Sequence, residues 1–85
     1  MIQKGSVYKP TKGRNKANIL RKVEHIQSAR VEFWEHELAG LTDRAPHDLF
    51  TLVRTVRVDF PPHDPRFHKT EYFVYSYFEG RHRKV

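Results

Sequence analysis

The sequence predicts an α+β fold in which one long amphipathic helix packs on an antiparallel two-stranded sheet, with a short N-terminal segment as an optional third strand. Two hydrophobic periods lead to this prediction. Apolar residues first recur at spacings of three and four, as on one face of a helix, and later alternate with polar residues, as in a half-buried strand. The length of 85 residues predicts a single small domain with a thin core.

The predicted helix spans about residues 15–39. Its apolar face is formed by residues three or four positions apart: Ile19, Leu20, Val23, Ile26, Phe33, Trp34 and Leu38. Asn15 or Asn18 can cap its first turn by accepting a backbone N–H bond. Gly40 suits a left-handed stop, and Leu41 suits the apolar contact that often follows one.

Two strands are expected after the helix. Residues 50–60 alternate apolar and polar side chains, and residues 71–79 (EYFVYSYFE) are rich in aromatic and branched residues. The three prolines of residues 61–69 cannot donate to a regular ladder, so we expect an antiparallel hairpin with a long tip. Symmetric pairing about residue 65 would set Val56 opposite Val74.

This pairing also sets Leu52 opposite Phe78 and leaves an aromatic face uncovered. Phe73, Tyr75 and Tyr77 gather on the second side of the sheet, while one helix can cover only the first. Either these rings are buried, in a homodimer or in a second core layer, or they stack on unpaired bases. We expect a homodimer, because two copies can bury this face.

The distribution of charge divides the chain into three parts. Gly5, Pro10 and Gly13 among lysines predict an extended basic arm at residues 1–14, followed by the α+β domain at residues 15–80 and a basic tail at residues 81–85. The formal net charge is +6. Counted by segment, residues 1–22 hold seven cations and no acid, residues 23–50 hold two cations and six acids, and residues 51–85 hold seven cations and four acids.

Such a basic chain is typical of nucleic-acid binders. Several of its cations fall at the N-terminus of the predicted helix, where the helix dipole disfavours them by roughly 0.3–1 kcal/mol each. An anion at that helix end would account for them, so we predict a phosphate site there. The predicted nucleic-acid-binding residues are Lys4, Lys9, Lys12, Arg14, Lys16, Arg21, Lys22, Arg57, Tyr75, Tyr77, Arg81, Arg83 and Lys84.

Two other functions remain open from the sequence. A small inhibitor or adaptor could use the same cations to bind an acidic partner protein. A small toxin-like ribonuclease could draw an acid, a base and phosphate stabilisers from the RHRK stretch at residues 81–84. That stretch is otherwise a solvated terminus, or it joins the arm in a two-ended phosphate clamp.

Several classes of site are not expected. The chain has no cysteine, which excludes disulfides and thiolate chemistry, and its histidines show no set of three metal ligands. We therefore expect no catalytic residues, no metal and no cofactor. No apolar run reaches the roughly 18 residues of a membrane span, and MIQKGSVYKP lacks the apolar stretch of a signal peptide. We expect no membrane partner and a cytoplasmic location.

Overall fold

The computed structural model describes residues 1–12, 18–34, 38–41, 44–61, 63–66 and 69–85. Their regular segments, in chain order, are β1 (Val7–Pro10), β2 (Arg21–Arg30), the 3-10 turn η2 (Val31–Phe33), β3 (Leu49–Arg57), β4 (Thr70–Val74), α1 (Tyr75–Arg81) and β5 (His82–Lys84). The strands form one antiparallel sheet in the order β4-β3-β2-β1-β5. Strands from opposite ends of the chain, β1 and β5, are therefore hydrogen-bonded neighbours.

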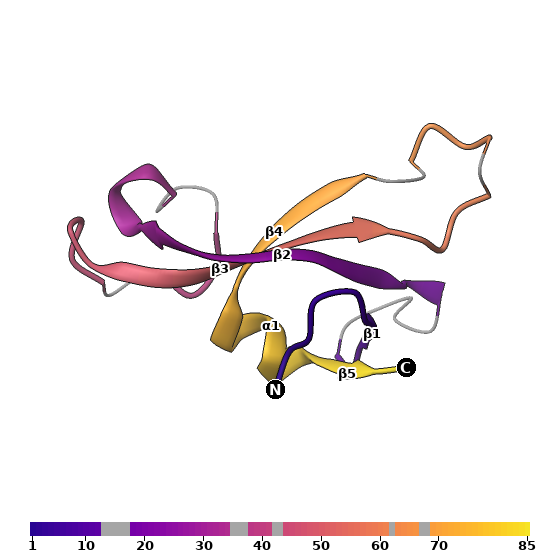
Figure 1. The fold of residues 1–85 in the computed structure, drawn as a ribbon, viewed down its shortest axis with the longest axis horizontal. Helices are drawn as coiled ribbons and strands as arrows, with labels where there is room; N and C mark the ends of the chain where they lie inside the picture. Colours follow the sequence, from indigo (N-terminus) through magenta and orange to yellow (C-terminus); the bar gives the residue numbers. More distant parts are fainter. Residues whose placement is uncertain (13–17, 35–37, 42–43, 62, 67–68) are drawn as a thin grey trace.

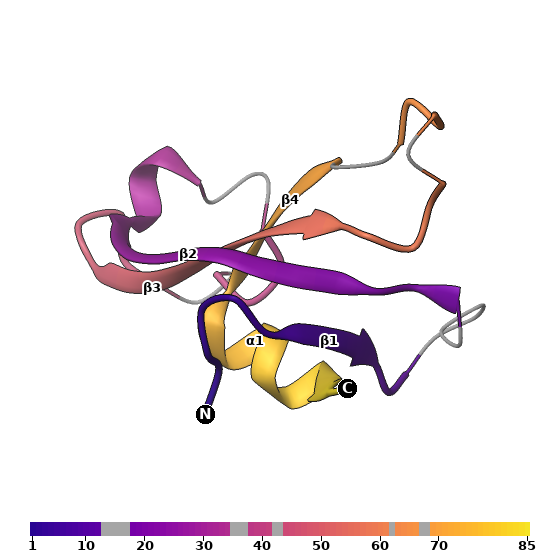
Figure 2. The same cartoon turned by 45° about the vertical axis from the view of Figure 1, so that its right-hand side comes forward.

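The sheet has a long part and a short part. In Figure 1, β2, β3 and β4 form an extended twisted ribbon, with η2 at one end and the β3–β4 loop at the other. Both views place α1, β1 and β5 together on one side of this ribbon (Figures 1 and 2). Both chain termini consequently lie in the short part of the sheet, next to α1.

The predicted fold class is wrong. The described chain is mostly sheet, with five strands and a single α-helix of 7 residues. Residues 21–30, expected in the middle of the long helix, form β2. Conversely, residues 75–79, expected to continue the second strand, lie in α1. The strand expected from residue 50 onward is confirmed as β3, although it covers residues 49–57.

A β-bulge explains the helix-like spacing in β2. The register of β2 against β3 shifts at Glu24, where β2 contains one extra residue. On either side of it, Val23 pairs with Thr55 and Ile26 pairs with Val53. Since Thr55 and Val53 are two positions apart on a regular strand, Val23 and Ile26 lie on the same face although three positions separate them. The three-residue spacing from Val23 to Ile26 is therefore a property of the bulge.

The helix α1 depends on tertiary packing rather than on local signals. Its N-cap residue Val74 makes no side-chain capping bond, and its aromatic residues are mediocre helix formers. Phe78, in contrast, is fully buried. One turn further on, His82 stacks on the Phe78 ring with centroids 3.9 Å apart. Burial of Phe78 thus outweighs the strand preference of the sequence.

The predicted strand register is wrong by four positions, and the predicted faces are right only for the residues of β4. Leu52 pairs with Val74 instead of Phe78, and Val56 pairs with Thr70 instead of Val74. Because side chains alternate with a period of two, an even slip leaves the residues of β4 on their expected faces. Phe78, expected on the same face as Leu52, instead packs with Val53 and Phe73 on the opposite face, because it lies in α1. The slip frees Phe78 from the sheet.

Two core clusters cover the two faces of the sheet. The first, beneath α1, contains Ile2, Tyr8, Val23, Val53 and Phe78, with Ile26, Phe73 and Tyr75 packed against it. The second, beside η2, contains Val31, Leu41, Phe50, Leu52 and Val74, with Ala29, Trp34, Leu38 and Tyr77 packed against it. The aromatic residues that led us to expect a homodimer are therefore half-buried within the chain, Phe73 and Tyr75 against the first cluster and Tyr77 against the second.

Candidate nucleic-acid interface

A groove of about 210 Å³ opens between β1, the C-terminal end of α1 and the start of β2. It is lined by Pro10, Lys12, Ile19, Arg21, Phe73, Tyr77, Arg81 and His82. The β1–β5 ladder positions these residues, since Pro10 is the partner of His82 and the Thr11 N–H donates to the Arg81 carbonyl at 2.8 Å. The basic segments at the two ends of the chain, predicted as an arm and a tail, therefore meet at one groove.

Arg21 lies in the wall of this groove with its side chain only 12% exposed. Its guanidinium forms an ion pair with Glu71 at 3.0 Å and donates from Nη1 to His82 Nε2 at 2.9 Å. It also lies 5.1 Å from the centre of the Phe73 ring. Although we predicted that Arg21 contacts phosphate, the structure already commits its guanidinium to internal partners.

The ring of His82 is fixed in one neutral form. An arginine can only donate, so Nε2 of His82 accepts the bond from Arg21. The proton is then on Nδ1, which donates to the Phe78 carbonyl at 3.0 Å. Burial, reinforced by the charge of Arg21, lowers the pKa of His82 below its ordinary value. With both nitrogens engaged, His82 offers neither a base nor an acid to a ligand in the groove.

The lowered pKa of His82 predicts a pH-dependent stability. Between the ordinary histidine pKa of about 6.5 and the lower pKa of the folded state, the unfolded chain binds more protons than the folded chain. The contribution of His82 to the free energy of unfolding should therefore be fully present above about pH 7. It should decrease as the pH drops through this window, by at most about 1.4 kcal/mol per pH unit.

Denaturant unfolding at pH values from 5 to 8 would measure this slope. The variant His82→Phe retains a ring to stack on Phe78 and removes the titrating group, so it serves as the control. The difference between the two slopes isolates His82 from the other five histidines of the chain. Equal slopes in the wild type and the variant would contradict the neutral, Arg21-bound state.

Cations at the rim of the groove face solvent. Lys12 and Arg81 are exposed, and neither forms an ion pair with any carboxylate in the part of the chain that the structure describes. The Arg81 guanidinium lies 4.5 Å from the centre of the half-buried Tyr77 ring. The rim therefore presents uncompensated positive charge beside an aromatic surface, a combination that suits a phosphate and an attached base.

Two cations face each other across the β1–β5 ladder. Lys9 pairs directly with Arg83, and like charges opposite one another destabilise a strand pair. Neither forms an ion pair within the described residues. The neighbouring Lys84 donates to the Gln3 side chain at 2.8 Å. Packing of the fold gives no reason for placing Lys9 opposite Arg83.

Other predicted contacts lie away from the groove. Lys4 and Lys22 line a separate hollow of about 340 Å³ together with Arg54, which pairs with Glu24 at 3.7 Å. The hydroxyl of Tyr75 accepts the Ile2 N–H at 2.8 Å. Tyr75 is thus part of the first core and does not belong to an open stacking face.

The remaining predicted contacts are Arg57, Arg14 and Lys16. Arg57 is bound to Asp59 through two hydrogen bonds of 2.7 and 2.6 Å. Arg14 and Lys16 lie outside the described residues. The phosphate site predicted at a helix N-terminus has no helix beneath it, because the chain that follows forms the strand β2. Arg21 and Lys22 therefore do not lie at the positive end of a helix dipole.

Sequence reasoning missed Arg66 and Lys69, which line a second cavity at the β3–β4 loop. We treated residues 61–69 only as a proline-rich tip. The signal that could have identified them is a pair of cations separated by two residues, in the connection between two predicted strands and six positions after the aromatic Phe60.

Comparison with known proteins adds no identification. Among the described residues, no group of three or more histidine or acidic side chains is placed to hold a metal ion. Within that same part of the chain, we find no helix with the length and apolar character needed to cross a membrane. No protein-family model, curated protein or solved structure matches this sequence.

Proposed function

We propose that the protein binds nucleic acid, without catalysing a reaction on it, through phosphate contacts at the β1–β5 edge and the adjacent groove. The observation that carries the proposal is the direct pairing of Lys9 with Arg83 without a compensating acid in the described chain. A polyanion across this edge would turn a repulsive pair into two phosphate contacts.

The surroundings of the Lys9–Arg83 pair support the same ligand. Lys12 and Arg81 extend the positive charge into the groove, where Tyr77 supplies a partly exposed ring. Rings of this kind stack on unpaired bases of any sequence. We therefore expect a preference for single strands with little discrimination between sequences.

The engaged state of His82 argues against the ribonuclease hypothesis. The groove supplies cations, but its histidine has no free nitrogen with which to accept the proton of a ribose hydroxyl. Incubation with plain RNA in the presence of a chelator tests this directly, and cleavage that depends on His82 would restore the hypothesis.

Replacing Arg83 with glutamine should weaken binding and stabilise the fold. Loss of one phosphate contact reduces the slope of log K against log salt by about 0.7 for a single strand, which corresponds to about fivefold in Kd at 0.1 M salt. Relief of the repulsion with Lys9 should raise the free energy of unfolding by about 0.2–1 kcal/mol. Fluorescence anisotropy with a labelled 12-nucleotide single strand, over a salt series, measures the first effect, and urea unfolding measures the second.

Arg44→Gln is the matched control. Arg44 is exposed and precedes β3. The first residue of β3, Leu49, pairs with Arg30 at the end of β2 that lies away from β1. The substitution Arg44→Gln removes the same charge without changing the β1–β5 edge, so the salt slope should remain that of the wild type. If Arg83→Gln and Arg44→Gln change the Kd and the salt slope equally, binding depends on the net charge of the protein and not on the β1–β5 edge. If the wild-type protein binds neither single-stranded nor double-stranded nucleic acid, but binds an acidic protein more weakly as salt increases, the partner-protein alternative is favoured.

A further inference from the structure

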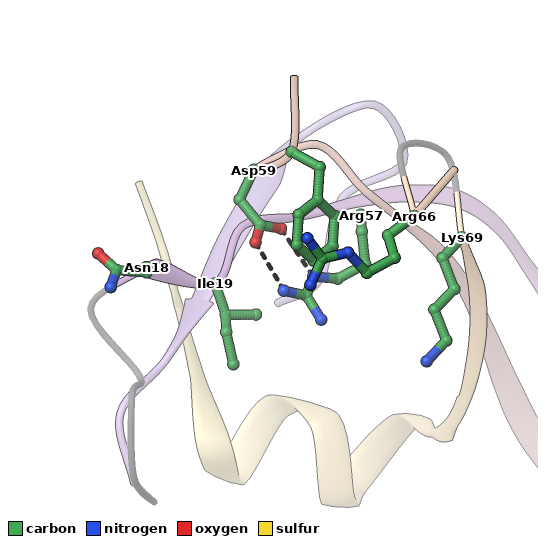
Figure 3. A pocket seen from close by; sticks show the side chains of 7 residues that line it. Asn18, Ile19, Arg57, Asp59, Arg66 and Lys69 are labelled. Atoms are coloured by element: carbon green, nitrogen blue, oxygen red, sulfur yellow. Dashed lines mark hydrogen bonds and ion pairs between the residues drawn. The ribbon is translucent and has the colours of Figure 1, made fainter. Parts of the chain in front are cut away.

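A second cavity, of about 410 Å³, lies where β3 ends and β2 begins. It is lined by Asn18, Ile19, Arg57, Asp59, Phe60, Arg66 and Lys69. Figure 3 shows the Arg57 and Arg66 side chains between Ile19 on one side and Lys69 on the other. Both guanidinium groups lie over the Phe60 ring. Three cations and one carboxylate face this space, so its lining carries net positive charge.

One of the three cations belongs to the framework of the fold. Arg57 and Asp59 form a fork-like pair with two hydrogen bonds, drawn as dashed lines in Figure 3. Asp59 also accepts the backbone N–H of Leu20 at 3.2 Å, which ties the start of β2 to the end of β3. The bond from Arg57 lowers the pKa of Asp59, which therefore stays charged and paired. Arg57 is thus held in place as part of the cavity wall.

Of the other two cations, Lys69 is without an ion pair among the described residues, and Arg66 is exposed although it makes two hydrogen bonds to Asp64. Lys69 is exposed and forms no ion pair within the described residues. Arg66 pairs with Asp64 at 2.7 Å, but its side chain is 63% exposed, so solvent and ligands can reach it. The Lys69 N–H donates to the Arg66 carbonyl at 3.0 Å, and the Lys69 carbonyl accepts the Arg57 N–H at 3.0 Å. These backbone bonds hold both cations beside the cavity.

An apolar surface accompanies the charge. The Phe60 ring centre lies 4.6 Å from the Arg57 guanidinium and 4.2 Å from the Arg66 guanidinium. Cation–π contacts of this length restrain the ring. Ile19 provides further apolar surface, and Asn18 adds an amide at the rim. A volume of 410 Å³ is within the range of small-molecule sites. The cavity therefore suits one nucleotide, with its base near Phe60 and its phosphate near Lys69.

Ile19 lines this cavity and also the groove at the β1–β5 edge. The two openings therefore share a wall, and a flexible anionic chain can pass over Ile19 from one to the other. We propose that the Arg66–Lys69 cavity is a second phosphate subsite, which holds a further nucleotide of the single strand bound at the β1–β5 edge. This inference rests on the proposed function and extends its binding path to the β3–β4 loop.

Lys69→Gln tests the subsite in the full-length protein with a 12-nucleotide oligodeoxythymidylate. Loss of one contact should raise the Kd about fivefold at 0.1 M salt and reduce the salt slope by about 0.7. The effects of Lys69→Gln and Arg83→Gln should add, because each variant removes a different phosphate. In a titration followed by NMR, the backbone amide signals of Phe60 and Arg66 should shift as the strand binds.

A charge-neutral pair of changes separates a local contact from net charge. Asp64→Asn combined with Arg66→Gln leaves the net charge of +6 unaltered and still removes the guanidinium. This variant should weaken binding, while Arg44→Gln should not. If Arg83→Gln weakens binding and the changes at Arg66 and Lys69 do not, the subsite is wrong and the proposed function stands. If the wild-type protein does not bind the strand, the proposed function fails and the subsite fails with it.

Discussion

Replacing Phe78 with alanine should lower the free energy of unfolding by about 3–5 kcal/mol. Phe78 is fully buried, and its ring touches three other rings. Ring-centre distances are 5.6 Å to Tyr8 in β1, 5.2 Å to Phe73 in β4 and 3.9 Å to His82 in β5. One side chain of α1 therefore holds three strands together, and its loss leaves a cavity that none of them can fill.

Such a loss is comparable with the whole stability expected for a domain of this size, which is roughly 0.05–0.15 kcal/mol per residue. Phe78→Leu is therefore included, since it should remain folded and show a smaller decrease. Guanidinium unfolding followed by circular dichroism measures both variants. Phe33→Ala is the matched control, because Phe33 is 69% exposed and its loss should cost less than about 0.5 kcal/mol. Similar losses at Phe78 and Phe33 would contradict the described core.

Replacing Arg21 with methionine should cost about 3 kcal/mol, the second largest effect that we expect. The change leaves the Glu71 carboxylate, only 21% exposed, without its cation. It also removes the donor to His82 Nε2. An unpaired charge in this position is more costly than the pair itself is stabilising, because the carboxylate has lost much of its hydration.

A double-mutant cycle with Glu71→Leu tests this explanation. The variant Arg21→Met with Glu71→Leu has no stranded charge, so it should be more stable than Arg21→Met alone. The exposed pair of Arg54 and Glu24 provides the comparison, since both side chains are more than 40% exposed and Arg54→Met should cost less than about 1 kcal/mol. Additive effects at Arg21 and Glu71 would show that the two side chains do not interact.

The sequence reveals the strand β3 and the positive charge of the chain, but it misleads about β2 and α1. In β2 the extra residue Glu24 converts a strand pattern into the spacing of a helix face. In α1 the aromatic residues favour a strand, and only the tertiary contacts of Phe78 override that preference. Neither the bulge nor the packing is visible in a single sequence, because both depend on a partner strand.

Local geometry was easier to predict than the context around it. Gly40 has φ +98°, the left-handed conformation that we expected, and Leu41 is buried beside it. The expected α-helix before them, however, is replaced over residues 21–33 by β2 and η2. A Cβ atom added to Gly40 would lie 3.5 Å from the Tyr77 Cβ and 3.6 Å from the Val74 Cβ, which are ordinary contacts, so it is the positive φ that favours glycine here.

The candidate site shows the same limit. Its cations were identified from composition, and Lys12 and Arg81 do line one groove. Their meeting depends on the pairing of β1 with β5, which connects residues more than 70 positions apart and leaves no periodic signal. The sequence offered a two-ended clamp only as an alternative to a solvated tail. It gave no indication that Arg21 would be taken up by Glu71 and His82.

The union of the first and last strands also affects how the protein is made. A ribosome synthesises residues 7–10 early, but their neighbour at residues 82–84 follows more than 70 residues later. Contacts between such distant positions form slowly, because a large loop must close before they bring any gain. Until β5 is synthesised and paired, Lys9 has no cation opposite it. The complete charged edge therefore exists only after translation has passed the final strand, so biogenesis itself delays the appearance of the binding surface.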